Sequence, residues 1–455
     1  MLDRTPYNPA QCRFGVVHVG VGSFHRAHQA VYFHNLLHHS DQQQWGIAGV
    51  NLLPGDTKII NALRANNHRY MLETLSQHGK STLQEIHSHL AFHDWQESRR
   101  EILTLFANPD VKIVTITISE SGYYGDDSGA LQTRHPDISG MSPATIYEFL
   151  RLCLQHRKQK NNTPITIICC DNMQRNGHNL RRWFMQYLEL VNAADLQKWV
   201  ERYVTFPNTM VDRITPTPPA LLDETIAQRI GRESRCAIMS EDFTQWVIED
   251  NFATDPPALS RVGVNFVDDI MPFEQAKIRI LNGGHSMLAY LGALRGHDTV
   301  DHALRDKSLA AMFEIFLYQE VLQGLRNDSP VDHKNYCAII RARFANPHIA
   351  DTLQRICLDG MTKLQQFILP TIEDCLARAI LPEIAITTLA AWYLYLQQGP
   401  SDYWDPKWHE LLHKPNTAQE FANCKDLWGD IPERHPEFVK HLVRRIDELH
   451  HHYHC

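Results

Sequence analysis

The segment 276–290, AKIRILNGGHSMLAY, carries a lysine, an asparagine and a histidine inside an otherwise apolar helical pattern. At about 100° per residue of an α-helix, Lys277, Asn282 and His285 fall within an arc of about 140°, so all three side chains can face one cavity. If this cavity also holds the positively charged ring of a redox cofactor, burial and the like charge both disfavour the ammonium form of the lysine. The lysine can then serve as a general base near neutral pH. Taking the proton from a hydroxyl group is the step that an alcohol oxidation requires of a protein.

A solvated lysine and a hydrogen-bonded core histidine are the ordinary explanation for such residues taken singly. Their apolar neighbours oppose that explanation, because a segment this apolar is buried and its polar side chains then need partners. The two consecutive glycines Gly283 and Gly284 each cost about 1 kcal/mol relative to alanine in a helix interior. We expect that a ligand comes close to the backbone here and makes the glycines necessary.

A second stretch with possible chemistry is VVHVGVGSFHRAH, residues 16–28, where Gly20 and Gly22 follow a buried strand and open a helix. Glycines at this place permit a tight turn and let a pyrophosphate approach backbone N–H groups. The third glycine of the usual fingerprint is absent, but the strand before and the helix after favour dinucleotide binding. Arg26 and His28 either steady the phosphates or only cap and solvate the helix, and the sequence leaves both possibilities open.

The tip of the next strand, GVNLLPGD, is where an acidic residue would bind the ribose 2′-hydroxyl. Asn51 stands at the expected position and Asp56 follows a few residues later, so Asp56 is the candidate for the ribose contact. No arginine cluster is present there to favour a 2′-phosphate. We therefore expect NAD as the cofactor, with NADP not excluded.

Short β-branched runs alternate with helical patterns through the first half of the chain. The strands and helices that they predict have to position the candidate cofactor-binding residues. The predicted strands are 14–20, 45–50, 111–119, 165–170 and 203–206, and the predicted helices are 26–39, 56–65, 95–106, 143–159 and 178–199. This alternation is typical of an α/β fold with a doubly wound, Rossmann-like sheet. Two further strand patterns, 68–76 and 83–92, are expected to extend one edge of the sheet.

Beyond about residue 270 the patterns are helical, in the ranges 274–294, 308–326, 349–369, 371–379, 382–398 and 433–450. A chain of 455 residues also exceeds the size of one typical core. The sequence thus predicts a dinucleotide-binding domain over 1–270 and a mainly α-helical substrate or catalytic domain over 271–455. The proline-rich 214–224 is expected to be a loop at the edge of the sheet domain.

Composition excludes several classes of function. The net charge is −8 and no basic block stands out, which argues against a nucleic-acid or anionic-membrane partner and favours a small molecule. The N-terminus lacks the pattern of a secretory signal and no apolar run is long enough to cross a bilayer, so we expect a cytoplasmic protein. The ten cysteines form no C-x-x-C pair, so neither disulfides nor a cysteine-rich metal site is expected.

Four ordered motifs resemble those of the polyol-specific long-chain dehydrogenase family, which includes mannitol 2-dehydrogenases and D-arabinitol 4-dehydrogenases. GVGSFHRAHQA at 20–30 is similar to the family's G-x-G-x-F-x-R-A-H, which adds Phe24 to the cofactor-binding candidates, and CDNMQRNG at 170–177 is similar to C-D-N-x-x-x-N-G. FPNTMVDRITP at 206–216 and KIRILNGGHS at 277–286 match two further motifs. Four motifs in order are far more specific than any one of them.

The resemblance implies a zinc-independent oxidoreductase that transfers hydride between NAD and a secondary alcohol of a linear polyol. Mannitol with fructose, or D-arabinitol with D-xylulose, would be the substrate pair, and the resemblance does not choose between them. It makes Lys277 the general base, Asn172 and Asn282 the donors to the developing alkoxide, and His285 a partner of a substrate hydroxyl.

Weaker parts of the resemblance suggest four more residues. Glu120 and Glu274 are candidates for carrying the abstracted proton to solvent, with an ion pair as the equally acceptable alternative. Arg355 and Lys363 are candidates for contact with distal hydroxyls of the substrate. No metal ligand and no oligomeric state follow from the sequence.

Two other functions stay open. The same scaffold serves sugar-acid oxidoreductases of the fructuronate and tagaturonate reductase type, which would need an extra cation for the substrate carboxylate, and the sequence has no clear one. A catalytically idle nucleotide-sensing protein is opposed by the presence of Lys277, Asn172, Asn282 and His285 together.

Overall fold

The computed structural model describes residues 2–3, 5–125, 129–132, 138, 146–326, 328–400 and 403–453. Contacts within the chain divide it into two compact units. The first comprises Met1–Ser76 and Lys80–Met271, and the second comprises Gln77–Gly79 and Pro272–Cys455.

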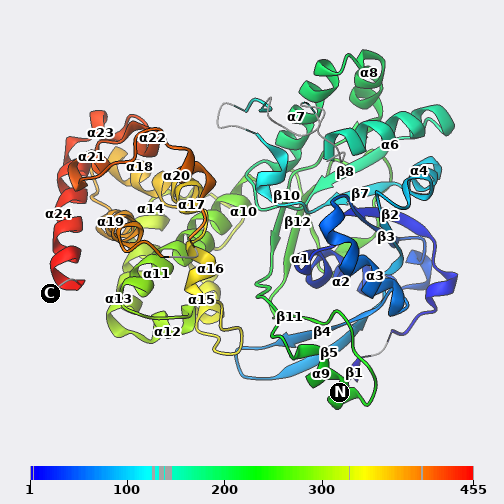
Figure 1. Ribbon diagram of the computed structural model, residues 1–455, viewed down its shortest axis with the longest axis horizontal. Coiled ribbons are helices and arrows are strands. Elements are labelled where there is room, and N and C mark those ends of the chain that lie inside the picture. The colour runs from blue at the N-terminus through cyan, green and yellow to red at the C-terminus, as the bar shows by residue number, and fades with distance from the viewer. Residues whose placement is uncertain are drawn as a thin grey trace. The chain divides into compact units, whose positions relative to one another are not determined.

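The core of the first unit is a parallel six-stranded sheet with the strand order β6-β3-β2-β7-β8-β9 (Figure 1). In that order the strands are His89–Asp94, Gly46–Asn51, Phe14–Val19, Ile113–Ile116, Ile165–Cys169 and Val204–Thr205. Neighbouring strands are parallel throughout. The chain adds β3 on one side of β2 and β7 on the other, so the winding reverses at β2, and this confirms the predicted doubly wound, Rossmann-like sheet.

Helices cover both faces of this sheet because side chains alternate between the faces along each strand. In β2, Val17 and Val19 share a core with α4 (Arg99–Ala107), α6 (Ile146–Lys160), α7 (Asn176–Leu190) and α8 (Ala194–Tyr203). Val16 points to the other face and shares a core with α1 (Ser23–Ala27), α2 (Gln29–Leu36) and α3 (Thr57–Ala65). A strand buried on both faces forms a continuous apolar run, which is why these strands were visible in the sequence.

Two smaller sheets complete the first unit, and they correct one expectation. The first has the order β1-β5-β4-β11, with strands Leu2–Asp3, Ser81–Ile86, Tyr70–Leu75 and Ile238–Glu241. The second has the order β10-β12-β13, with strands Thr209–Asp212, Gln245–Glu249 and Asn265–Val267. The expectation that 68–76 and 83–92 extend the main sheet is wrong for β4 and β5, which pair with each other in antiparallel fashion. Only β6, which takes up the end of the second range, lies at the edge of the main sheet.

Several predicted helices are interrupted. The range 26–39 is divided between α1 and α2 at His28, where φ is −121° and ψ is −90°. The range 178–199 is divided between α7 and α8 near Asn192, which has a φ of 54°.

The proline-rich range 214–224 was expected to be a loop, and its end lies inside the helix α9, Leu222–Ile230. The predicted start at Pro143 lies outside the described residues, and α6 is described from Ile146.

The second unit is helical among its described residues, as predicted. Two largely buried helices, α11 (Gly283–Leu294) and α19 (Glu383–Gln397), pack against each other. The other α-helices between residues 271 and 377 are α10 (Met271–Ala276), α12 (Val300–Arg305), α13 (Lys307–Ile315), α14 (Leu322–Gly324), α15 (His333–Phe344), α16 (Leu353–Cys357), α17 (Gly360–Phe367) and α18 (Leu369–Ala377). Those after α19 are α20 (Pro406–Glu410), α21 (Ala418–Ala422), α22 (Lys425–Trp428), α23 (Ile431–Arg434) and α24 (Pro436–Tyr453).

Within the part of the chain that the structure describes, no helix is both long and apolar enough to cross a membrane. The apolar stretch that begins at Ile384 forms most of α19, whose buried side chains pack in the interior of the second unit. Each of the nine described cysteines is free.

Candidate functional site

The Gly20–Gly22 turn joins β2 to α1, and its two glycines do different things. Gly20 has a φ of 95°, and a Cβ there would lie 1.8 Å from the carbonyl oxygen of Thr117, so no other residue fits. Gly22 precedes the first residue of α1, and no described atom lies within 4 Å of a Cβ built on it. The backbone of Thr117 thus packs against Gly20, whereas the space beside Gly22 is empty of described atoms. A phosphate group can approach the backbone there.

Side chains from two neighbouring strands hold this turn. The backbone N–H of Val21 donates to Oδ1 of Asn51 at 2.6 Å, and Asn51 is the last residue of β3. The hydroxyl of Thr117, just beyond β7, donates to the carbonyl of Gly20 at 2.8 Å. Asn51 is thus turned inward to support the turn, although its position in the sequence is that of a ribose-binding acid.

The other cofactor-binding candidates lie near this turn in the sequence. The Phe24 ring stacks on His28 with centroids 5.1 Å apart, and Arg26 is buried and donates through Nη1 to the carbonyl of Cys236 at 2.6 Å. These contacts give Arg26 a structural role, so its contact with a cofactor stays a prediction. Asp56 is exposed at the end of the short helix Pro54–Asp56, where the neighbouring chain removes part of the water around its carboxyl group and, together with the charge of Asp94, raises the carboxyl pKa.

The carboxyl ends of adjacent parallel strands bring more candidates to the edge of the sheet where Gly20 lies. Glu120 follows β7 and Asn172 follows β8, and both are exposed. Since β2, β7 and β8 are neighbours, with Val19 opposite Ile116 and Ile116 opposite Cys169, these loops leave one stretch of the sheet edge. A ligand in a doubly wound sheet binds at this edge, beside the strand where the winding reverses.

The lysine segment of the second unit is not a continuous α-helix. Residues Lys277–Asn282 form a π-helix between α10 and α11, and the N–H of Gly283 donates to the carbonyl of Ile278, five residues earlier. In this wider turn residues five apart follow one another on the same face, whereas in an α-helix they would lie about 140° apart. The π-helical turn thus places Lys277 and Asn282 on one face, and both residues are only 8% exposed.

The side chain of Asn282 has a hydrogen-bond donor that is not used within the described part of the chain. Its side-chain Nδ2 is buried and has no hydrogen-bond partner among the described residues. His285, one α-helical turn further on, stacks on Phe344 with ring centroids 3.9 Å apart and an interplanar angle of 9°. A buried N–H donor without an acceptor costs about 1–3 kcal/mol, and a ligand oxygen would remove that cost.

The glycine pair has a different reason from the expected one. A Cβ on Gly284 would lie 2.8 Å from the Phe313 ring, and a Cβ on Gly283 would lie 3.1 Å from the carbonyl oxygen of Phe367. Both glycines therefore allow α13 and the end of α17 to pack closely against α11 within the second unit. The expectation that a ligand requires them is wrong, because neighbouring helices fill that space.

The remaining candidates of the second unit lie on three helices. Glu274 is buried in α10, three residues before Lys277. Arg355 in α16 makes two hydrogen bonds to the buried Asp351, at 2.8 and 2.5 Å. Nζ of Lys363 in α17 donates to the carbonyl of Ile356 at 3.0 Å. Their predicted contacts with substrate stay predictions.

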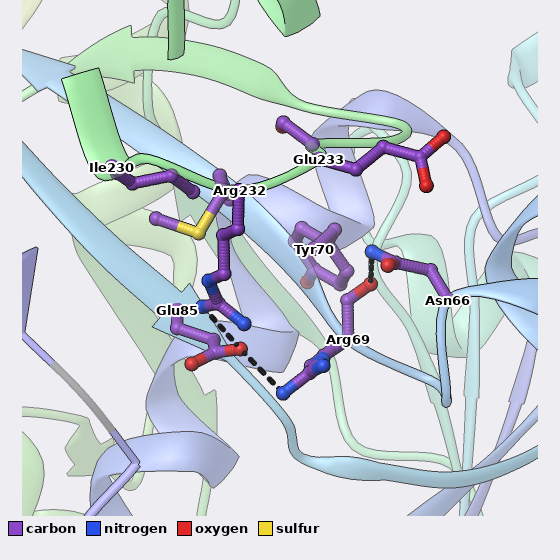
Figure 2. A pocket seen from close by; sticks show the side chains of 9 residues that line it. Asn66, Arg69, Tyr70, Glu85, Ile230, Arg232 and Glu233 are labelled. Atoms are coloured by element: carbon purple, nitrogen blue, oxygen red, sulfur yellow. Dashed lines mark hydrogen bonds and ion pairs between the residues drawn. The ribbon is translucent and has the colours of Figure 1, made fainter. Parts of the chain in front are cut away.

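A surface pocket of the first unit lies elsewhere in the fold, between β4, β5 and the chain after α9 (Figure 2). Arg69 and Arg232 point to the same carboxylate oxygen of Glu85, at 3.2 and 2.9 Å. The lining residues are Asn66, Arg69, Tyr70, Met71, Glu85, Ile230, Arg232, Glu233 and Ser234. None of them is among the predicted site residues, and the guanidinium charges are already partly balanced by Glu85.

The described residues include no group of three or more histidine, cysteine, aspartate or glutamate side chains that could hold a metal ion. The donors that the two units supply are instead the backbone N–H groups at the start of α1, an amine at Lys277 and carboxamides at Asn172 and Asn282. Such a set can bind a phosphate, take up a proton and donate hydrogen bonds to an oxygen that gains negative charge.

Comparison with known proteins covers nearly the whole chain. Residues 14–261 match the model of the mannitol dehydrogenase Rossmann domain, and residues 269–450 match that of the mannitol dehydrogenase C-terminal domain. D-arabinitol 4-dehydrogenase of Klebsiella pneumoniae is 34% identical, over 92% of this chain and 94% of that protein. Mannitol 2-dehydrogenase of Cereibacter sphaeroides is also 34% identical, over 95% of this chain and 93% of that protein.

A solved structure agrees with these matches. Mannitol 2-dehydrogenase of Pseudomonas fluorescens, in a ternary complex with NAD and D-mannitol, has a TM-score of 0.87 and 31% identity to this chain. The alignment covers 98% of this chain and 94% of that one. The resemblance noted in the four motifs is thus confirmed over both domains, and the chain belongs to the mannitol dehydrogenase family.

Proposed function

We propose that this chain is an NAD-dependent polyol dehydrogenase, which oxidises a secondary alcohol of a linear polyol to a ketose and catalyses the reverse reaction. The observation that carries the proposal is the π-helical turn, because it places a buried lysine and a buried asparagine with an unsatisfied N–H on one face. The names of two relatives, a D-arabinitol 4-dehydrogenase and a mannitol 2-dehydrogenase, support the same class of substrate.

The Gly20–Gly22 turn suits the pyrophosphate of a dinucleotide. The open backbone at Gly22 lets a phosphate oxygen approach the N–H groups that begin α1, and the inward hydrogen bonds from Asn51 and Thr117 keep that backbone in place. The exposed Asp56 is the side chain that would bind the ribose hydroxyls and disfavour a 2′-phosphate. Bound NAD supplies the acceptor for the hydride that leaves the alcohol carbon.

The protein's own contribution is proton transfer and stabilisation of charge on the substrate oxygen. The amine of Lys277 takes the hydroxyl proton as the carbon–hydrogen bond breaks, and in ketose reduction its ammonium returns that proton. The Nδ2–H of Asn282 donates to the same oxygen, and the resemblance assigns the carboxamide of Asn172 to that oxygen as well. Such donors act where negative charge develops in the transition state, so they lower the barrier more than they increase substrate affinity.

The other candidates orient the substrate or move protons. The ring of His285 has a defined plane because it stacks on Phe344, so it can present one nitrogen to a substrate hydroxyl. Glu274 and Glu120 are placed in the path of the proton to solvent by the resemblance alone. Arg355 and Lys363 would meet hydroxyls at the far end of the chain of carbons.

A neutral polyol suits the second unit better than a sugar acid. A sugar-acid oxidoreductase needs a cation for the substrate carboxylate, but the guanidinium of Arg355 is already paired with Asp351 through two hydrogen bonds. Arg279 is likewise buried and paired with Asp374, at 2.8 Å. A polyol substrate therefore requires no rearrangement of these ion pairs.

The test is to follow NADH absorbance with D-mannitol, D-arabinitol, sorbitol and xylitol, and the reverse reaction with fructose, D-xylulose, fructuronate and tagaturonate. We expect turnover of at least one polyol, and a much lower turnover of the best substrate in Lys277→Ala, with a change of less than about threefold in the Kd of NADH. A uronate reduced faster than every ketose would favour the sugar-acid function. Undiminished turnover in Lys277→Ala would remove the lysine from the mechanism.

A further inference from the structure

The carboxylate of Asp171 ties together the loops that follow β7 and β8 in the first unit. Oδ2 accepts hydrogen bonds from the N–H of Ile118 at 3.0 Å and from the hydroxyl of Tyr123 at 2.5 Å. Oδ1 accepts from the N–H of Ser119 at 3.0 Å. The side chain is buried, and it directly precedes Asn172, whose carboxamide is proposed to hold the reacting oxygen.

The β7 loop that Asp171 binds has a strained backbone. Ser119 has a φ of 70° and a ψ of 155°, a region that residues other than glycine rarely adopt. Such a conformation costs about 1–3 kcal/mol and persists only where the surroundings determine it. The N–H of Ser119 itself donates to Asp171, so the carboxylate is one of the groups that stabilise this conformation.

The backbone carbonyl of Asp171 also takes part in hydrogen bonds, and these fix the turn that contains Asn172. The N–H of Met173 donates to the carbonyl of Asp171 at 2.9 Å, which makes Asn172 the central residue of a three-residue turn. Nδ2 of Asn176 donates to that carbonyl at 3.1 Å and to the carbonyl of Thr209 at 3.0 Å. The ends of β7, β8 and β10 are thereby joined around Asn172 through hydrogen bonds that converge on Asp171.

We propose that Asp171 is a positioning residue, whose ionised carboxylate holds the Ile118–Ser119 loop and the Asn172 turn in the arrangement that presents the Asn172 carboxamide to the substrate oxygen. Two backbone N–H groups and a phenol need three acceptor sites, which a carboxylate supplies and a carboxamide does not. The inference rests on the proposed function, since it assigns Asn172 to the reacting oxygen.

The ionisation of this carboxyl group provides a readout. Burial raises the pKa of Asp171 to about 6, with a further increase from the charge of Glu120, while hydrogen bonds from Tyr123, Ile118 and Ser119 oppose the shift. The other titratable groups beside it are the Cys169 and Cys170 thiols, whose pKa values burial raises, so they stay neutral in this range. The carboxylate is present above about pH 6 and is lost below it, when one oxygen becomes a donor.

The experiment compares wild type with Asp171→Asn and with Asp110→Asn, a change of the same kind at an exposed carboxylate. Ketose reduction is the informative direction, because Lys277 must then be protonated and a falling pH cannot disable it. We expect wild type and Asp110→Asn to lose kcat below about pH 6. In Asp171→Asn we expect kcat at about pH 7.5 to be lower by on the order of 100-fold, without that acidic limb and with the Kd of NADH within about threefold of wild type.

A second variant, Tyr123→Phe, tests the role of Asp171 even if the Asp171→Asn protein does not fold. Tyr123→Phe leaves Asp171 in place but removes a hydrogen bond that favours its charged form, so we expect the acidic limb to move to higher pH. An unchanged limb in Tyr123→Phe, or unchanged kcat in Asp171→Asn, overturns the positioning role. Equal losses of kcat and NADH affinity also overturn it, because they indicate general damage. Absence of turnover in wild type with every polyol and ketose refutes the proposed function itself. The role of Asp171 is refuted separately, by the comparison of the variants with an active wild type.

Discussion

The buried carboxylate of Glu320 in the second unit should make the free energy of unfolding depend on pH by an amount that its pKa shift gives. Glu320 lies in the π-helical segment Phe316–Val321, and its two oxygens accept hydrogen bonds from the first turn of α19. The N–H of Ile384 donates to Oε1 at 2.7 Å, and the N–H of Ala385 donates to Oε2 at 2.9 Å. Burial nevertheless raises the pKa of Glu320 from its usual 4.5 to about 7, since these hydrogen bonds only partly offset the loss of water.

The sign of the pH effect follows from proton linkage. Because the folded pKa is higher than the unfolded pKa, the folded state binds more protons between about pH 4.5 and pH 7, and the free energy of unfolding falls as the pH rises. A shift from 4.5 to about 7 corresponds to about 3 kcal/mol in total, of which about 2.5 kcal/mol is lost between pH 5 and pH 8. The loss is complete once the pH passes the folded pKa.

The perturbation is Glu320→Gln, which cannot ionise and so lacks this pH dependence. Urea unfolding, followed by circular dichroism at pH 5, 6, 7 and 8, would give the free energy of unfolding of each protein. We expect the Glu320→Gln variant to be less stable than wild type at pH 5, because its amide N–H₂ faces a backbone donor of α19, and this disadvantage should shrink by about 2.5 kcal/mol at pH 8. Glu433→Gln, a change of the same kind at an exposed carboxylate, is the matched control, and its difference from wild type should stay constant. A wild-type minus Glu320→Gln difference that is constant between pH 5 and pH 8 would refute the reasoning.

Two further predictions concern the site. Asn282→Ala should lower kcat by about 10²–10³-fold, because it removes a donor to the developing charge, while the Kd of NADH changes little; steady-state kinetics and fluorescence titration measure both, and an unchanged kcat would contradict the role of the unsatisfied Nδ2. Gly22→Val should leave the melting temperature within a few degrees, because the space beside Gly22 is open, yet weaken NADH binding by at least about tenfold; undiminished affinity would show that no phosphate occupies that space.

Part of the candidate site was visible in the sequence, and part of it was not. The Gly20–Gly22 turn was predicted because its signal is local, with a buried strand before it and a helix after it. The inward role of Asn51 was missed, although a polar residue at the end of a buried strand beside a glycine turn is a signal that could have indicated it. Asp171 was also missed, since its partners Ile118, Ser119 and Tyr123 are about fifty residues away in the chain.

The sequence by itself determined the class of fold, because β-branched runs buried on both faces and amphipathic helices are patterns that a short window of residues contains. Only the tertiary structure decided the antiparallel pairing of β4 with β5, the glycine packing against α13 and α17, and the π-helical turn at Lys277–Asn282. A π-helical turn has the same local composition as an α-helix and poorer intrinsic geometry, so packing from neighbouring helices has to select it. That selection brings the lysine and the asparagine closer to one line than the arc of about 140° that α-helical spacing predicts, and the sequence pattern does not contain this change.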